Sequence, residues 1–243
     1  MSQWFTIARI VPERLGLNGT AASGEILAAT LRHRGHQVSL VDVHGPEGAP
    51  STVDIVTLGS TSTSQIAPTT TELISLVRIF QSWKDQGAWW VGIGVGWDVL
   101  GTHITLSDGE RLPGAGIFPT SADHRPGRLM GEVVGTDYRG RPSAGYVNQV
   151  GVSELGDGVV PLMDFTGAPD GFPSTDGAVG ERLWGTRLGG PALALNPHWS
   201  ADIVSGVLAS RGLSSAPSEF DERVEDVASK ARSLIENRVL NRR

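Results

Sequence analysis

Residues 91–101, VGIGVGWDVLG, decide the fold class of this sequence. The apolar run AWWVGI enters a corner at Gly94-Val95-Gly96, and WDVLG leaves it with the spacing of a helix. A strand, a sharp turn and a helix in this order are how α/β enzymes raise a Ser or Cys above the edge of a sheet. The stretch therefore has the form of a nucleophile elbow, but its corner contains only glycine and valine.

The segments before this corner predict alternating strands and helices. Strand patterns cover residues 5–11, 37–43 and 53–59, and single amphipathic helices are expected over residues 23–35 and 70–87. Such alternation indicates an α/β fold with a mostly parallel sheet flanked by helices. The second half is less regular and favours short, more antiparallel strands, with a helix over residues 197–212 and mostly surface loop over residues 156–180.

Residues 218–243 predict an amphipathic C-terminal helix. Ser218 and Asp221 have the spacing of a capping box at its start. Six apolar residues share one face: Phe220, Val224, Val227, Ala231, Leu234 and Ile235. We expect residues 1–212 to form one domain and residues 213–243 to form a helix that packs on it or docks a partner.

The composition excludes several classes of function. Apolar residues make up 39% of the 243 residues and charged residues 19%, as in ordinary globular proteins, and the net charge of −6 argues against nucleic acid as a partner. No run of 18 apolar residues and no signal peptide are recognisable, so we expect a cytoplasmic protein with no membrane span. The absence of cysteine excludes thiolate catalysis and cysteine-bound metal. We expect no metal and no cofactor.

Four stretches, in chain order, resemble class I glutamine amidotransferases of the CobB/CobQ type, in particular the GatD-type members. They cover residues 11–35, residues 54–65 (DIVTLGSTSTSQ), residues 92–101 and residues 185–204 (GTRLGGPALALNPHWSADIV). Weaker matches are GAGIFP at 114–119 and GYVNQVG at 145–151. The resemblance implies a flavodoxin-like glutaminase fold, in which a Cys at the elbow attacks the glutamine amide and a His transfers the proton.

The residues at the matched positions cannot perform this reaction. The family Cys falls on Gly94 and the family His on Gly189, and glycine supplies neither a nucleophile nor a base. Losing either member of such a pair removes most of the rate. The remaining candidates for a residual pocket are Gly59, Ser60, Thr61, Val95, Trp97, Asp98, Asn148 and Gln149. We expect surface or capping roles for the histidines outside the matched motifs, among them His124.

Several functions remain open at this point. By analogy with GatD, which works with the Mur-ligase-like subunit MurT in amidating lipid II, the first is a pseudoenzyme that acts as scaffold or regulator of a Mur-ligase-like partner in peptidoglycan metabolism. The second is a small-molecule binding module that uses the emptied pocket. The third is an enzyme of unrelated chemistry that uses Asp98 or Ser60. In a fourth, ammonia or ligands reach a synthetase through this protein while another protein supplies the glutaminase step.

Overall fold

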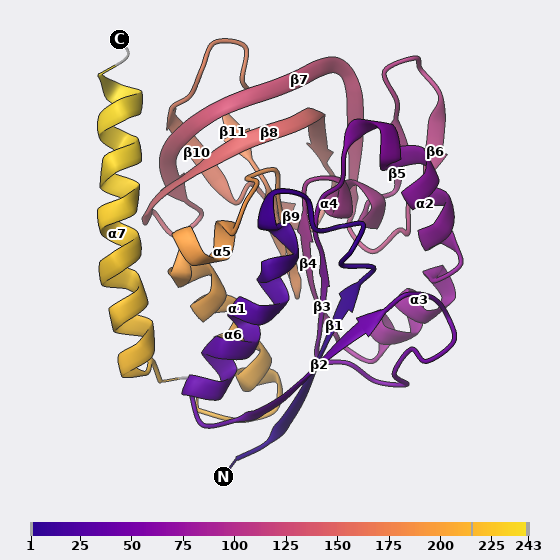
Figure 1. Ribbon diagram of the computed structural model, residues 1–243, viewed down its shortest axis with the longest axis vertical. Coiled ribbons are helices and arrows are strands. Elements are labelled where there is room, and N and C mark those ends of the chain that lie inside the picture. The colour runs from indigo at the N-terminus through magenta and orange to yellow at the C-terminus, as the bar shows by residue number, and fades with distance from the viewer. Residues whose placement is uncertain (1, 215, 242–243) are drawn as a thin grey trace.

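The computed structural model describes residues 2–214 and 216–241, and a twisted central sheet forms its core (Figure 1). The strand order is β2-β1-β3-β4-β13-β12-β9, and the first five strands are parallel. Their bounds are β1 Trp4–Ile10, β2 Gln37–Val43, β3 Ile55–Leu58, β4 Trp89–Ile93 and β13 Leu183–Thr186. The short strands β12 (Ala178–Gly180) and β9 (Val159–Val160) extend the sheet in antiparallel pairing.

A second sheet is built around two long antiparallel strands, β7 (Thr120–Asp137) and β8 (Pro142–Leu155). In Figure 1 this ribbon arches over the end of the central sheet where α4 (Val95–Leu100) lies. The sheet is completed by β5 (His103–Thr105), β6 (Arg111–Pro113), β10 (Met163–Gly167) and β11 (Thr175–Asp176).

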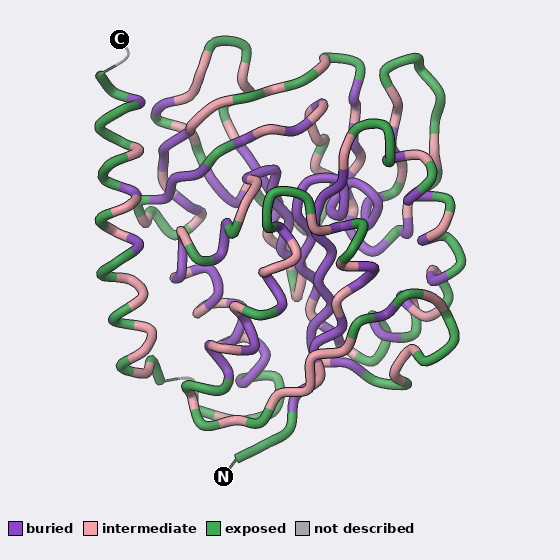
Figure 2. The backbone as a smooth tube through the Cα atoms, viewed as in Figure 1, coloured by how far each residue is buried: buried purple, intermediate pink, exposed green. Residues whose placement is uncertain are grey.

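Helices cover both faces of the central sheet, as the sequence predicts. On one side lie α1 (Ser23–His33), α5 (Ala192–Leu195) and α6 (Pro197–Ser210), and on the other α2 (Ile66–Ile74) and α3 (Val77–Asp85). Short 3₁₀ helices, η1 (Leu17–Ala22) and η2 (Thr63–Gln65), precede α1 and α2. The buried residues concentrate along the central strands and the inner helix faces (Figure 2). No helix within the two described ranges combines the length and apolar character that a membrane span requires.

Two expectations about local structure are wrong. The single helix over residues 70–87 is two helices. The Ser75 amide donates to Glu72 O and the Leu76 amide to Leu73 O, three residues back, and these hydrogen bonds tighten the chain and turn Leu76 into the core. Residues 156–180 are not mostly surface loop, since they contain β9 to β12 and the fully buried Leu162. Strand β10 pairs with β7, a partner distant in sequence, whereas β12 forms a tight hairpin with β13 and also pairs with β9.

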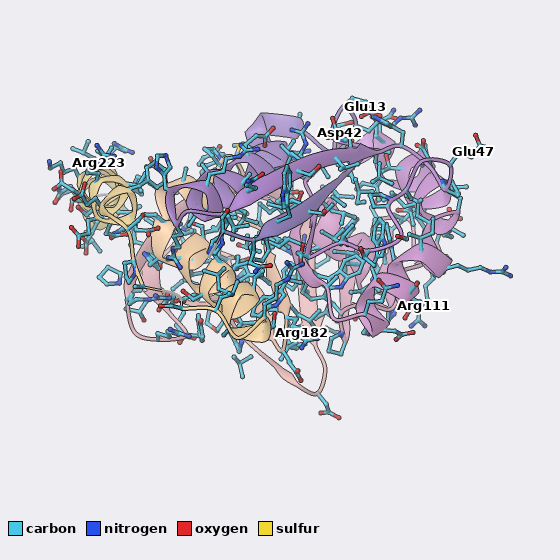
Figure 3. All side chains as sticks on the ribbon, turned by 90° about the horizontal axis from the view of Figure 1, so that it is seen from below. Glu13, Asp42, Glu47, Arg111, Arg182 and Arg223 are labelled. Carbon is cyan, nitrogen blue, oxygen red and sulfur yellow. The ribbon has the colours of Figure 1, made fainter. Side chains whose placement is uncertain are left out.

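Helix α7 (Glu219–Leu240) begins with the predicted capping box between Ser218 and Asp221. Viewed along its axis in Figure 3, it lies at one edge of the molecule and carries Arg223. The predicted apolar face is only partly correct, because Val227 and Leu234 are 67% and 61% exposed. The residues that α7 buries against the domain are Ala228, Arg232 and Val239. The domain boundary at residue 212 stays a prediction.

Candidate functional site

The elbow, defined here as Gly94-Val95-Gly96, joins β4 to α4. Gly94 has φ 55° and ψ −123°, a conformation that residues with a side chain rarely adopt. Its amide donates to Thr186 O on β13 at 2.8 Å, and its carbonyl accepts from the Asp98 amide at 3.1 Å. The corner is therefore held by a neighbouring strand and by the first turn of α4, in the backbone form of a nucleophile elbow.

Ser60 and Gln149 fill the space beside Gly94. A Cβ atom on Gly94 would lie 2.5 Å from Ser60 Oγ and 2.6 Å from Gln149 Nε2, closer than real Cβ contacts. Ser60 Oγ donates to Gln149 Oε1 at 3.1 Å and accepts from the Val95 amide at 3.3 Å. Both residues are buried, with Ser60 1% and Gln149 7% exposed. A side chain at position 94 would collide with this pair.

The backbone amides around the elbow already have acceptors within the chain. The Ser60 amide donates to Thr20 Oγ1 at 2.8 Å, the Val95 amide to Ser60 Oγ, and the Gly96 amide to Gly59 O at 2.9 Å. An oxyanion hole needs donors aimed at the place where charge develops on a substrate. These three amides are aimed at protein oxygens. The neighbouring Thr61 is also buried.

Gly189 lies in an open environment, unlike Gly94. Its amide donates to Tyr146 O at 2.8 Å, and a Cβ atom there would find Tyr146 O at 3.5 Å, an ordinary contact. The residue lines a cavity of about 430 Å³. Other lining residues are Asn18, Tyr146, Asn148, Gly190, Pro191 and Ile235. Of the two glycines, only Gly189 leaves room for a side chain.

The alternating side chains of β8 separate Asn148 from Gln149. Gln149 faces the elbow, whereas Asn148 lines the cavity beside Gly189. Asn148 Oδ1 accepts from Arg128 Nη1 at 2.6 Å, and Arg128 Nη2 donates to Thr63 Oγ1 at 3.0 Å. Arg128 thus links β7 and β8 to the start of η2. Asn148 and Gln149, both predicted as pocket residues, therefore do not line the same cavity.

Trp97 and Asp98 form part of the protein interior. The Trp97 ring is 1% exposed and packs against the backbone of Gly185. Asp98 is 3% exposed, and its carboxylate accepts from Arg187 Nη2 at 2.7 Å and lies 2.9 Å from His124 Nε2. The expectation of a surface or capping role for His124 is therefore wrong. Asp98, His124 and Arg187 tie α4 to β7 and to the loop after β13.

Arg187 is a residue of the site that the sequence analysis did not identify. Its guanidinium also donates to Ser153 Oγ at 2.8 Å and to Val150 O at 3.0 Å, and lies 5.7 Å from the centre of the Trp97 ring. A buried carboxylate is tolerated only when it is paired and hydrogen-bonded. The sequence signal that could have indicated such a residue is Asp98, because an acid within an otherwise apolar helix requires a cationic partner.

A second buried carboxylate, that of Asp176, holds the segment between β13 and Gly189 in place. Thr186 Oγ1 donates to Asp176 Oδ2 at 2.5 Å and accepts from the Leu188 amide at 3.0 Å. The Arg187 amide also donates to Asp176, at 3.1 Å. Burial raises the pKa of the Asp176 carboxyl, against the opposing effect of these hydrogen bonds. The loop from β13 to Gly189 is thereby fixed by backbone and side-chain bonds.

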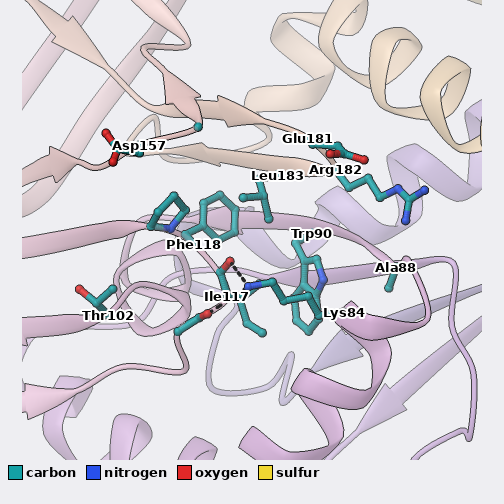
Figure 4. Close-up of a pocket in the computed structure, with 13 residues that line it drawn as sticks. Lys84, Ala88, Trp90, Thr102, Ile117, Phe118, Asp157, Glu181, Arg182 and Leu183 are labelled. Carbon is teal, nitrogen blue, oxygen red and sulfur yellow. Dashed lines mark hydrogen bonds between the residues drawn. The ribbon is translucent and has the colours of Figure 1, made fainter.

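Another cavity, of about 650 Å³, is lined by none of the predicted site residues (Figure 4). Trp90, Phe118 and Leu183 line it, and Lys84 Nζ donates there to Gly116 O at 3.2 Å and Ile117 O at 3.1 Å. Within residues 2–214 and 216–241, no group of three or more histidine or acidic side chains is placed to hold a metal ion. The elbow and the cavity beside Gly189 therefore remain the site to be explained.

Known proteins resemble this chain in sequence and in fold. Residues 25–197 match the model of the CobB/CobQ-like glutamine amidotransferase domain. The chain is 24% identical over 221 residues to subunit GatD of the lipid II isoglutaminyl synthase (glutamine-hydrolyzing) of Staphylococcus aureus (strain N315), over 90% of this chain and 91% of that protein. A solved glutamine amidotransferase shares 13% identity and a TM-score of 0.50, over 82% of this chain and 98% of its own. Another, from Thermotoga maritima, has 15% identity and a TM-score of 0.49, over 97% and 98%.

Proposed function

Because the chain belongs to the family of CobB/CobQ-like glutamine amidotransferase domains, we propose that it is a member that does not hydrolyse glutamine. In this proposal it serves as a scaffold or regulatory subunit of a Mur-ligase-like enzyme in cell-wall precursor metabolism. A cytoplasmic location is part of the same proposal.

The elbow is the observation that carries this proposal. Glutaminase chemistry of the family type needs a nucleophile at the corner and a base beside it, and the matched positions are Gly94 and Gly189. The space for the nucleophile is occupied by Ser60 and Gln149, and the nearby amides donate to protein oxygens. The backbone of the corner persists, while the groups that would perform the reaction do not.

The proposed partner follows by analogy from the Staphylococcus aureus relative, which is one subunit of a larger synthase. On α7, Val227 and Leu234 are seven residues apart, which places them on the same helical face, and both are exposed. Exposed apolar side chains that share a face favour protein contact. This helix is therefore the surface where we look first for the partner.

Co-expression with a Mur-ligase-like protein from the same genome tests this function. We expect the two chains to co-elute on size-exclusion chromatography as one complex. Substituting Leu234→Glu should weaken the complex at least about ten-fold, or about 1.4 kcal/mol. The matched control is Ser233→Glu, which adds the same charge at an exposed position about 100° around the helix and should leave the complex unchanged. Failure of every Mur-ligase-like protein of that genome to bind would overturn the partner assignment. Supplying the complex with either glutamine or free ammonium as nitrogen donor would then show whether another protein provides the glutaminase step.

A second candidate function is binding of a small molecule in the cavity beside Gly189. Its volume of about 430 Å³ lies within the usual range of ligand sites, and the side chains of Asn18, Tyr146 and Asn148 offer polar groups. A thermal-shift screen with amino acids and peptidoglycan precursors tests it. Any stabilisation should disappear in Gly189→Trp, which fills the cavity, and a shift that survives this substitution would place the ligand elsewhere.

A further inference from the structure

The side-chain carboxamide of Gln149 lies against the elbow, within a protein of a family that acts on the same chemical group. Of its neighbours, Ser60 Oγ donates to Oε1 at 3.1 Å, and Ser60 Oγ itself accepts the Val95 amide. The carbon and nitrogen of the carboxamide lie 2.7 Å and 2.6 Å from where a Cβ on Gly94 would be. Gln149 is thus in the nucleophile's place and is held by groups of the elbow.

We propose that Gln149 is an internal carboxamide ligand that occupies the elbow and closes it both to free primary carboxamides and to a side chain at position 94. This inference rests on the proposed function, because it concerns the same site. It goes beyond the loss of catalytic residues: the site is filled by a group of the chain itself and is not an empty remnant.

The pairing of β7 with β8 explains how Gln149 reaches this position. The register is regular from Thr136 to Arg128 on β7, and then shifts between Arg128 and Asp123, opposite Gly151. Gly151 has φ 79°. Irregularities of this kind bend a strand. Gln149 itself pairs with Leu129 inside the regular register, and the alternation of side chains along β8 places it on the buried side, against the elbow.

Hydrogen bonding distinguishes a held carboxamide from simple filling of space. Burying an amide without partners is unfavourable, whereas an apolar side chain of similar length would fill the same volume without that cost. Such a side chain would leave the buried Ser60 hydroxyl without its acceptor in Gln149. The Val95 amide donates to Ser60 Oγ, which donates to Gln149 Oε1. This arrangement therefore requires a carbonyl oxygen at that place, and an apolar group of the same size would not satisfy it.

Shortening Gln149 tests the proposal directly. In Gln149→Ala the carboxamide is removed and Ser60 Oγ loses its acceptor, so the elbow should bind a small primary carboxamide. We expect propionamide to bind this variant at least about ten-fold more tightly than the unchanged protein, by calorimetry or thermal shift. The matched control is Asn148→Ala, the adjacent residue that faces the other cavity, which should gain no affinity. Equal affinity of the three proteins for propionamide would overturn the proposal.

A cysteine placed at position 94 gives a second, independent readout. Since the chain has no other cysteine, Gly94→Cys would introduce its only thiol. We expect the double variant Gly94→Cys/Gln149→Ala to react with a thiol reagent such as DTNB at least about ten-fold faster than Gly94→Cys, because access controls thiol reactivity. Circular dichroism of both variants reports folding. If Gly94→Cys fails to fold while the double variant folds, this also supports Gln149 as an internal ligand. Equal rates in two folded variants contradict it, and so does failure of both to fold combined with no gain of affinity in Gln149→Ala.

The failure of this inference and that of the proposed function are distinguishable. Ammonia release from glutamine by the unchanged protein would refute the loss of activity. Absence of carboxamide binding by Gln149→Ala would refute the internal ligand while leaving the loss of activity untouched.

Discussion

Adding one methyl group at the elbow, by Gly94→Ala, should destabilise the protein strongly. A side chain in a left-handed conformation costs about 1–2 kcal/mol, and Gly94 has φ 55°. The new Cβ atom overlaps Ser60 Oγ at 2.5 Å and Gln149 Nε2 at 2.6 Å, and overpacking of this kind costs about 1–3 kcal/mol. Losing the bond between Ser60 and Gln149 adds about 0.5–1.5 kcal/mol. The expected decrease in the free energy of unfolding is about 2.5–6.5 kcal/mol, or a fall in Tm of about 5–26 °C.

Urea unfolding followed by fluorescence and circular dichroism measures this decrease. Gly189→Ala is the matched control, because its Cβ would meet nothing nearer than 3.5 Å, and it should change the free energy by no more than about 0.5 kcal/mol. In Gly94→Ala/Gln149→Ala the overlap with Gln149 is relieved, so the two costs should be less than additive by about 1–3 kcal/mol. Equal stability of the two alanine variants, or strict additivity in the double variant, would refute the reasoning.

Three further predictions concern the surroundings of the site. Asp98→Asn leaves the buried Arg187 guanidinium without its carboxylate, so urea unfolding should show a loss of about 3–5 kcal/mol; a loss below about 1 kcal/mol would contradict a buried ionic cluster. Burial, assisted by the Arg141 guanidinium, lowers the pKa of His198 from its usual 6.5. The unfolded chain therefore binds a proton more readily than the folded protein, so the free energy of unfolding decreases as the pH falls below about 6.5. His198→Gln should flatten Tm between about pH 6.5 and pH 5, and an unchanged slope would contradict this assignment. Arg232→Ala removes the hydrogen bond from α7 to the last carbonyl of α5, and hydrogen exchange over residues 219–240 should accelerate about ten-fold while α1 is unaffected; unchanged exchange would contradict this anchor.

The parallel half of the fold could be predicted from the sequence because its signals are local. Strand patterns around residues 5–11 and 53–59, a glycine corner after β4, and the capping box at Ser218 each specify their own element. What the sequence concealed depends on distant contacts. Strand β10 is stabilised by pairing with β7, and β9 by pairing with β12. The exposed positions on α7 follow from how that helix meets the β7–β8 ribbon.

The backbone elements around the candidate site could be predicted from the sequence, whereas its side-chain contacts could not. Gly94 lies at a strand-to-helix corner, as the pattern predicts, and Gly189 lies in the loop after β13. That these are the family's catalytic positions stays a prediction. The hypothesis of an emptied pocket expects free space at both glycines. In the structure, Ser60 and Gln149 cover Gly94, whereas Gly189 borders a cavity. This difference depends on how the β7–β8 ribbon lies over the corner and brings Gln149 against Gly94, a contact between distant segments that leaves no period or motif in the sequence.

Ammonia release from glutamine by the purified chain, alone and with the proposed Mur-ligase-like partner, tests the central claim most directly. The Staphylococcus aureus relative with its own partner serves as the positive control. The account predicts that release by this chain equals that of buffer under both conditions, and that Gly94→Cys alone does not restore it. Release that saturates with glutamine and is abolished by Ser60→Ala would contradict the account.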